Sequence, residues 1–386
     1  MSWSKLPKAA RKYILYHCCV TPLLFWWYVI PYIMLNKGLS VEETGLLYTL
    51  GILTSSIVNF LIGKLLDKGS PNLLMAIIAV FDVISYTIYF LAFSYGIKIL
   101  ILAAIAVEYI GRGFYPVYPV YEYEIYPEDA REKAFIYHYA LPFLSQAVSY
   151  PIIGFILVKY FDTVDKLVYT VAFIALTSII FILLPLYWLQ KVEVTRIEKE
   201  EKEKAKIRFS GKLLLLALIL IMLSVAYSLA PTFVLVNLFI ENFGGGLFEI
   251  GVYESIVGFT MALFALPLLK VDKKHGKKLT IAGLLLIALA FIILGASKDF
   301  LLAFISAFLS SVGEAIMTPF YMDALFSQIP KELKGSIIGG IAGIRRVINL
   351  TTPFIAGILA GISPSLPYLI SGLMVAVVAL AYFISS

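Results

Sequence analysis

Long apolar runs dominate this sequence of 386 residues and restrict what it can fold into. Each run has roughly the 20 residues that a helix needs to cross a hydrocarbon core of about 30 Å. They stay apolar throughout instead of alternating over about ten residues, which favours helices over a membrane β-barrel. The hydrophobic fraction of 61% is above the level of about half that is usual in globular proteins. The sequence therefore predicts an all-α polytopic membrane protein.

We predict twelve transmembrane helices, six on each side of a charged segment. The first run follows four basic residues, as in a signal peptide, but it is too long and no small-residue cleavage site follows it. The predicted spans are residues 13–35, 46–62, 73–97, 99–121, 134–158 and 167–190, and then 213–240, 250–269, 279–297, 300–322, 335–362 and 366–385.

The charged segment, residues 191–212, separates two blocks of similar length. It has eight basic residues interspersed with glutamates and no aromatic residue before Phe209, so it cannot bury a core of its own. We expect a solvated helix or a flexible linker. The predicted domains are accordingly an N-terminal six-helix bundle at 1–190, a cytoplasmic linker at 191–212 and a C-terminal six-helix bundle at 213–386.

Lysine and arginine residues are distributed unequally between alternate connections. One side of the predicted membrane has 23 of the 31, the other side has 5, and 3 lie within spans. Because basic residues are enriched in cytoplasmic connections, this distribution places both termini and residues 191–212 in the cytoplasm. The net charge of +6 is thus a signal of topology in the plasma membrane, and we expect no nucleic-acid partner.

The two blocks resemble each other at a nearly fixed offset, which indicates an internal duplication. Because six helices return the chain to its starting side, the two repeats have the same orientation. The matches at an offset of 203 are Pro116 with Pro319, Tyr118 with Tyr321, Pro127 with Pro330 and Gly154 with Gly357, and those at 206 are Glu43 with Glu249 and Gly45 with Gly251.

The connection between the second and third spans carries a motif, Gly63-Lys64-Leu65-Leu66-Asp67-Lys68-Gly69. It resembles the signature loop of the major facilitator superfamily, G-x-x-x-D-(R/K)-x-G-(R/K)-(R/K), although Gly69 comes one residue early and Ser70 and Pro71 replace the basic pair. A degenerate copy beginning at Asp272 occupies the equivalent connection of the second block.

This resemblance implies two six-helix bundles that rock around a site near the membrane midplane. It also implies that Asp67 latches the halves in one state, close to the region around Gly335 and to Arg131. An aspartate at this place can cap a neighbouring helix N-terminus, where the helix dipole favours an anion. The latch would comprise Gly63, Asp67, Lys68, Gly69, Arg131 and Asp272; alternatively, Asp67 and Lys68 only mark the cytoplasmic boundary.

Six charged residues fall near the predicted midplane: Asp82, Glu108, Arg112, Glu314, Arg345 and Arg346. A charge there costs about 2.5–3.5 kcal/mol on insertion scales, so each is a functional candidate. Glu108 and Arg112 are four residues apart on one helix and can pair, with Asp82 as a rival partner for the arginine. Glu314 can pair with Arg345 or Arg346. These pairs either neutralise one another structurally or exchange an arginine for a proton or substrate.

Glu314 is our first candidate for a proton carrier because its arginine comes from another helix, whose distance can change; Glu108 and Asp82 follow. Arg112, Tyr115, Tyr118, Arg345, Arg346 and Glu254 are candidates for the substrate cavity. The two tyrosines would offer rings and hydroxyls to an amphipathic or cationic solute. Glu254, about two turns into its span, is either an outer gate or a surface charge that reaches toward the headgroups.

His17, Cys18 and Cys19 suggest a metal site, but neighbouring helical residues point about 100° apart. No second cluster of Cys or His is visible in the sequence, so we expect no metal site and no cofactor. The sequence also has no H-E-x-x-H, G-x-S-x-G or Walker A motif, which argues against an enzyme.

The predicted function is a secondary active transporter that works as a proton-coupled antiporter and exports amphipathic compounds. Uptake of a sugar or an organic anion is the alternative that the three arginines within spans favour, and export of a metal ion is a less favoured one. The expected partners are a small-molecule substrate, protons and the lipid bilayer, and we expect a monomer.

The charge distribution makes a topology prediction. Tags at residue 2, near Lys202 and at Ser386 should be cytoplasmic, whereas tags near Lys37 or Lys298 should be external. Protease or thiol labelling of intact cells measures this directly. An external tag at Lys202 would overturn the span count.

Overall fold

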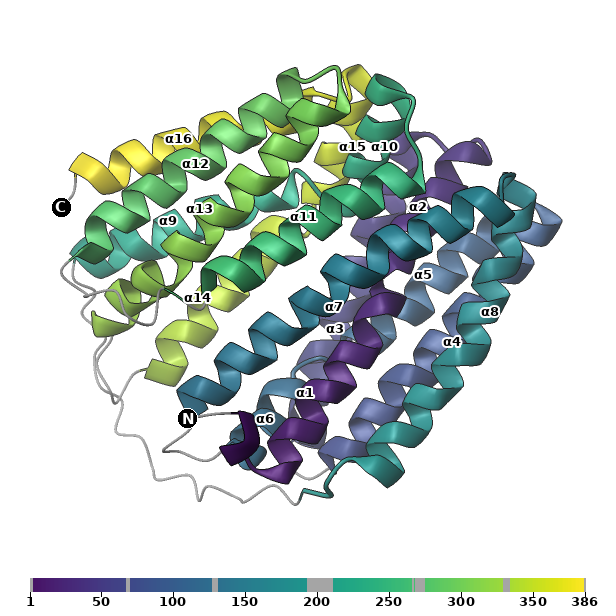
Figure 1. Cartoon of the computed structure of the whole chain (residues 1–386), viewed down its shortest axis with the longest axis horizontal. Coiled ribbons are helices and arrows are strands. Elements are labelled where there is room, and N and C mark those ends of the chain that lie inside the picture. The colour runs from purple at the N-terminus through teal and green to yellow at the C-terminus, as the bar shows by residue number, and fades with distance from the viewer. Residues whose placement is uncertain are drawn as a thin grey trace.

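The computed structural model of the chain is a bundle of α-helices that run roughly along a common direction (Figure 1). It describes residues 3–66, 70–126, 131–192, 211–265, 267, 275–328 and 334–384. These described residues form no β-strand, as the length of the apolar runs predicts. Most of the charged segment lies outside them.

The described elements of the first half, residues 3–192, are η1 (Trp3–Lys5), α1 (Lys8–Val20), η2 (Thr21–Phe25), α2 (Trp26–Asn36), α3 (Val41–Leu66), α4 (Pro71–Tyr95), α5 (Lys98–Arg112), α6 (Val117–Ile125), α7 (Arg131–Tyr160), α8 (Val164–Leu183) and η3 (Leu184–Trp188). Those of the second half, residues 211–384, are α9 (Gly211–Ser228), α10 (Thr232–Phe243), α11 (Leu247–Ala265), α12 (Gly276–Ala296), α13 (Phe300–Ser327), α14 (Lys334–Asn349), α15 (Thr352–Ile362) and α16 (Leu366–Ile384).

Several predicted spans are broken helices, and a proline lies at each break. The first span divides at η2, which contains Pro22, and the fourth divides into α5 and α6 before Pro116 forms the N-cap of α6. In the second half, α9 and α10 meet at 44° beside Pro231. Proline lacks an N–H and its ring clashes with the preceding turn, which favours these breaks, although α7 and α13 contain prolines without a break.

The number of spans follows from these breaks. Ten helices of the described residues are long and apolar enough to cross a membrane, and α9 with α10 makes an eleventh as a bent pair. The span predicted at 335–362 corresponds to α14 and α15, which have only 16 and 11 residues. The prediction of an all-helical polytopic membrane protein is confirmed. A twelfth span would have to be formed by α14 and α15 together.

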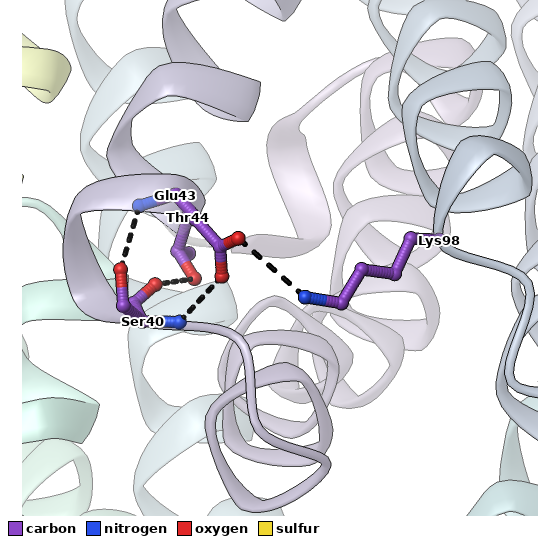
Figure 2. Close-up of polar contacts among 4 residues, drawn as sticks. All are labelled: Ser40, Glu43, Thr44 and Lys98. Carbon is purple, nitrogen blue, oxygen red and sulfur yellow. Dashed lines mark hydrogen bonds and ion pairs between the residues drawn. The ribbon is translucent and has the colours of Figure 1, made fainter.

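A capping box starts α3 (Figure 2). The Glu43 backbone N–H donates to Ser40 Oγ at 3.1 Å, and the Ser40 backbone N–H donates to Glu43 Oε2 at 2.9 Å. Two N–H groups that a helix start leaves unpaired are thereby satisfied. Lys98 at the start of α5 lies 3.5 Å from Glu43 Oε1, so the same carboxylate joins two helices.

The second half repeats this cap at the predicted offset. Glu249, which matches Glu43, accepts a hydrogen bond from the Gly246 backbone N–H at 2.8 Å in the first turn of α11. Gly246 is in turn 206 residues after Ser40. We call the end of the bundle where α3 and α11 begin the capped end.

The halves meet through two helix pairs that correspond to each other in the duplication. α3 of the first half packs against α15 of the second, and α11 of the second half packs against α7 of the first. Figure 1 shows α7 and α11 side by side. Each pair therefore combines one capped helix with a helix of the other repeat.

Matched glycines bring the backbones of these pairs into contact. A Cβ placed on Gly45 of α3 would lie 2.5 Å from the Pro353 carbonyl oxygen, and one on Gly251 of α11 would lie 2.6 Å from the Tyr150 carbonyl oxygen. In the reverse direction, a Cβ on Gly154 would lie 2.6 Å from the Leu247 carbonyl oxygen. Small residues permit such close helix approach in membranes.

The capped end is closed between the halves. α2 packs against α10 there, and the rings of Tyr48 on α3 and Phe233 on α10 stack with centroids 5.4 Å apart. At the opposite end, the described parts of α1 and α9 do not pack together extensively. The halves are therefore in closer contact at the capped end.

The chain is anchored up to the start of the charged segment. Asn72 of α4 donates to the carbonyl oxygens of Pro185 and Gln190 and accepts from the Val192 backbone N–H. α9 begins at Gly211, so the ends of the segment predicted as a linker belong to the folded halves.

The glycine contacts predict a large effect of a small substitution. Gly154→Val should lower the stability of the purified protein by roughly 1–3 kcal/mol, because the new side chain would clash with the α11 backbone. The symmetry-related Gly357→Val should cost a similar amount. Thermal unfolding in detergent measures both.

The matched control is Gly343→Ala on α14, since within the described part of the chain no atom beyond its neighbours and its own helix backbone lies within 4 Å of a Cβ placed there. It should leave the melting temperature unchanged or raise it, because alanine is the better helix former. Equal melting temperatures for all three variants would contradict the proposed role of the glycine contacts.

Candidate functional site

The predicted ion pair within the fourth span is present at the end of α5. Arg112 pairs with Glu108 one turn earlier on the same helix. The guanidinium also lies over the rings of Trp27 at 4.6 Å and Tyr109 at 4.5 Å from the centroids. Arg112 is therefore neutralised and held in place by two aromatic faces.

Glu108 is only 5% exposed and has a second partner. The Tyr89 hydroxyl on α4 donates to Glu108 Oε2 at 2.9 Å, while Arg112 contacts Oε1. Both carboxylate oxygens thus accept a hydrogen bond, as a buried charge requires. This part of the site is a fixed pair.

A small cavity of about 70 Å³ lies beside this pair, inside the first half. Three candidates for the substrate cavity, Arg112, Tyr115 and Tyr118, line it together with Asp82, Trp27 and Tyr86. α1, α2, α4, α5, α6 and α8 all contribute side chains. The break between α5 and α6 turns Tyr115 and Tyr118 toward it.

Asp82 differs from Glu108 in its surroundings. Among the described residues, no ion pair or hydrogen bond to the Asp82 carboxylate is found. Of the two expected partners of Arg112, Glu108 forms the ion pair and Asp82 does not. Glu108 and Arg112 act on Asp82 only through longer-range electrostatics. The cavity therefore has one carboxylate that lacks a bound cation.

The predicted pairing of Glu314 with Arg345 or Arg346 is wrong for this conformation. Within the described residues Glu314 forms no ion pair, and Arg346 instead donates to Asn59 Oδ1 on α3 at 2.5 Å. The reason is the break at the start of α15: α14 packs against α9, and its last turn contacts α3 of the other half. Arg345 is half-buried, and its Nε has no hydrogen-bond partner.

Glu254 is neither a surface charge nor part of the cavity. It is 9% exposed and lies between α11 and α7, where the Gln146 side-chain amide donates to Glu254 Oε2 at 2.9 Å and to its backbone carbonyl oxygen at 3.0 Å. Tyr28 of α2 interacts with the same carboxylate. The interpretation of Glu254 as a snorkelling charge is corrected, because the close approach of α7 and α11 encloses it.

The latch predicted from the motif is described only in part. Gly63 belongs to α3, whereas Asp67, Lys68, Gly69 and Asp272 lie outside the described residues. Arg131 begins α7, where its guanidinium lies over the Tyr123 ring at 4.5 Å. The latch therefore remains a prediction.

Three ligand-type side chains meet near the C-terminal end of α1, and the sequence pointed to only one of them, His17. His17, Glu122 and His138 each have a ligand atom within 4.8 Å of the others. The argument that His17 has too few partners is corrected, since α6 and α7 supply them. A histidine within a predicted span was the available signal.

Glu122, Gln146 and Asn59 were missed for a related reason. Each is polar and within or close to a predicted span, but its partner lies 16 to 287 residues away in the sequence. Spacing within one helix cannot show such pairs.

The comparisons with known proteins agree with this architecture. The family model described as Major Facilitator Superfamily matches residues 18–347 and 216–386. No curated protein sequence matches the chain.

Solved structures match over nearly the whole chain at low identity. A POT family transporter in complex with a thioalcohol-conjugated peptide has a TM-score of 0.70 and 15% identity, covering 99% of this chain and 98% of its own. The human organic anion transporter MFSD10 has a TM-score of 0.62 and 14% identity over 98% and 100%. A bacterial homolog of the human lysosomal transporter Spinster, inward-facing and unoccupied, has a TM-score of 0.68 and 14% identity over 98% and 97%.

At these identities the structures show the fold alone, and the family model covers most of the chain. The chain belongs to the major facilitator superfamily and is a secondary transporter, not an enzyme.

Proposed function

We propose that this transporter is a proton-coupled antiporter that exports small amphipathic compounds, cationic ones in particular. The observation that carries the proposal is the unpaired Asp82 carboxylate in a cavity lined by Trp27 and tyrosines. Aromatic faces attract cations and apolar groups, and a carboxylate without a bound cation complements a positive charge. Arg112 does not oppose this, because Glu108 neutralises it.

The transport cycle would move two bundles, residues 1–190 and 213–386, that the segment 191–212 joins. The glycine contacts of α3 with α15 and of α7 with α11 supply narrow surfaces on which the bundles can rock. The distribution of basic residues supports an external capped end, with both termini in the cytoplasm of a plasma-membrane protein. A closed capped end corresponds to a cytoplasm-facing conformation.

Proton coupling requires a carboxylate whose surroundings change during this movement. Glu254 on α11 has Gln146 and Tyr28, both from the other half, as partners. If the capped ends separate, both partners move away and water reaches the carboxylate. Glu254 therefore joins Glu314, Glu108 and Asp82 as a candidate carrier, and the fixed partners of Glu108 make it the weakest of the four.

Uptake of an organic anion is a second candidate function, favoured by one observation. Arg345 forms no ion pair among the described residues, so its charge is available to an anion. The similar solved structures do not decide between the two, because they include a transporter with a bound peptide conjugate, an organic anion transporter and the nucleoside transporter NupG.

The substrate proposal makes a prediction for Asp82→Asn. Loss of a charge-assisted contact of about 1.5–3 kcal/mol should weaken the apparent affinity for an amphipathic cation by roughly tenfold or more. Uptake of tetraphenylphosphonium by proteoliposomes, with counterflow to show carrier behaviour, measures it.

The matched control is Asp162→Asn, since Asp162 is an exposed aspartate between α7 and α8 that pairs with Lys166. It should transport as the wild type does. Wild-type affinity for the cation in Asp82→Asn would contradict our proposal. Transport of an organic anion that depends on Arg345 would favour the alternative.

The coupling proposal makes a prediction for Glu254→Gln. Glutamine can keep the contacts with Gln146 and Tyr28 but cannot release a proton. Accumulation driven by a pH gradient should be lost, while exchange of substrate without a gradient should continue at a similar rate. Glu314→Gln is tested in parallel because both glutamates are candidates.

Glu241→Gln is the control, because Glu241 is an exposed glutamate at the end of α10. It should keep gradient-driven transport. If Glu254→Gln and Glu314→Gln also keep it at the wild-type rate, neither residue carries the proton.

A further inference from the structure

Two of the three histidines of the chain meet in the first half, although 121 residues separate them. His17 lies on α1, His138 on α7, and Glu122 on α6 lies between them. One nitrogen of each histidine and a carboxylate oxygen are all within 4.8 Å of one another. The two imidazole rings have centroids 4.6 Å apart.

The polar contacts within this group leave one buried nitrogen, a possible metal ligand, without a partner. His138 Nδ1 lies 3.4 Å from Glu122 Oε1, and the side chains are 18% and 12% exposed. His17 Nε2 is buried and has no hydrogen-bond partner among the described residues. A buried polar atom without a partner is costly and needs an explanation.

Glu122 is held from outside the group. The Tyr13 hydroxyl, one turn before His17 on α1, donates to Glu122 Oε1 at 3.0 Å. Metal ligands in proteins are commonly oriented by such an outer hydrogen bond. Tyr13 is fully buried, and its ring is 4.6 Å from that of His17, so it fixes the position of both side chains.

We propose that His17, Glu122 and His138 bind a first-row divalent transition-metal ion, with Zn²⁺ or Co²⁺ as suitable probes. Two imidazoles and one carboxylate form a donor set typical of such ions, whereas Mg²⁺ and Ca²⁺ prefer oxygen ligands alone. Ligand atoms around a tetrahedral zinc lie about 3.3 Å apart. The three ligand atoms now lie within 4.8 Å of one another, so rotations of the side chains would bring them to the distances that a bound ion requires.

All three ligands come from helices of the first half, and none of them lines the Asp82 cavity that we propose for the substrate. The group therefore indicates a resident ion and not cargo. A bound ion would fasten α1, α6 and α7 together at the end opposite to the capped end. Cys18 and Cys19, next to His17, are not part of the group.

The experiment uses the full chain, purified through a tag without histidine and stripped with a chelator. Titration with Co²⁺ should give visible d–d absorption bands that saturate at one ion per chain, and Zn²⁺ should displace them. His17→Gln, His138→Gln and Glu122→Gln should each weaken Co²⁺ binding by more than about tenfold. Zn²⁺ should raise the melting temperature of the wild type but not that of these three variants.

His275→Gln is the matched control, because His275 is exposed, precedes α12 and makes no side-chain cap. It should bind Co²⁺ as the wild type does. Tyr13→Phe keeps all three ligands and should bind one ion about tenfold more weakly. Far-ultraviolet circular dichroism of each stripped variant shows that it is folded.

Saturable binding that survives in folded His17→Gln and His138→Gln would overturn the proposal, as would the absence of Co²⁺ bands in the wild type. Either result would mean that the group is only a cluster of polar side chains, in which Tyr13 donates to Glu122 and His138 lies beside the carboxylate. Neither outcome affects the transport proposal, which depends on Asp82 and Glu254.

Discussion

The close approach of backbones at matched glycines is the contact on which the rest of this structure depends. Gly45 and Gly357 on one side and Gly251 and Gly154 on the other leave no room for a Cβ between α3 and α15 or between α11 and α7. Lipid tails are as apolar as the helices, so tight packing must supply the attraction between the halves. Because both contacts lie toward the capped end, they close this end and enclose Glu254. The buried carboxylate is thus a consequence of the packing, and its environment must change whenever that packing does.

The charged residues within the predicted spans are arranged differently in the two halves. In the first half, Glu108 and Arg112 satisfy each other on one helix, with Tyr89 and Trp27 completing their surroundings. This pair moves as a unit and can orient the cavity without taking part in the cycle. In the second half, Glu254 and Arg346 have partners from the first half, Gln146 and Asn59. Charges whose partners lie across the interface can respond to the movement, while those whose partners lie on the same helix cannot.

The sequence predicted those features that depend on local pattern. The apolar runs predicted helices, the offset of 206 matched Glu43 with Glu249, which both prove to cap helices, and a spacing of four predicted the pair of Glu108 and Arg112. It failed where a partner depends on how helices pack. Arg346 contacts α3 and not Glu314, because α14 ends at a break that composition alone does not place. His17 found His138 only because α1 packs on α7, which no spacing within either helix reveals.

The break between α5 and α6 connects the two sites of the first half. Pro116 ends the straight course of the fourth span, and α6 then presents Tyr118 to the cavity and Glu122 to His17 and His138. Tyr118 belongs to both sites, since its ring lies 5.4 Å from that of His17. The matching proline of the second half, Pro319, stays inside an unbroken α13. A residue shared by both repeats therefore bends only one of them, since local packing decides whether a proline kinks a helix or interrupts it. The duplicated halves have diverged at this point, and the first half has acquired both the cavity and the histidine group there.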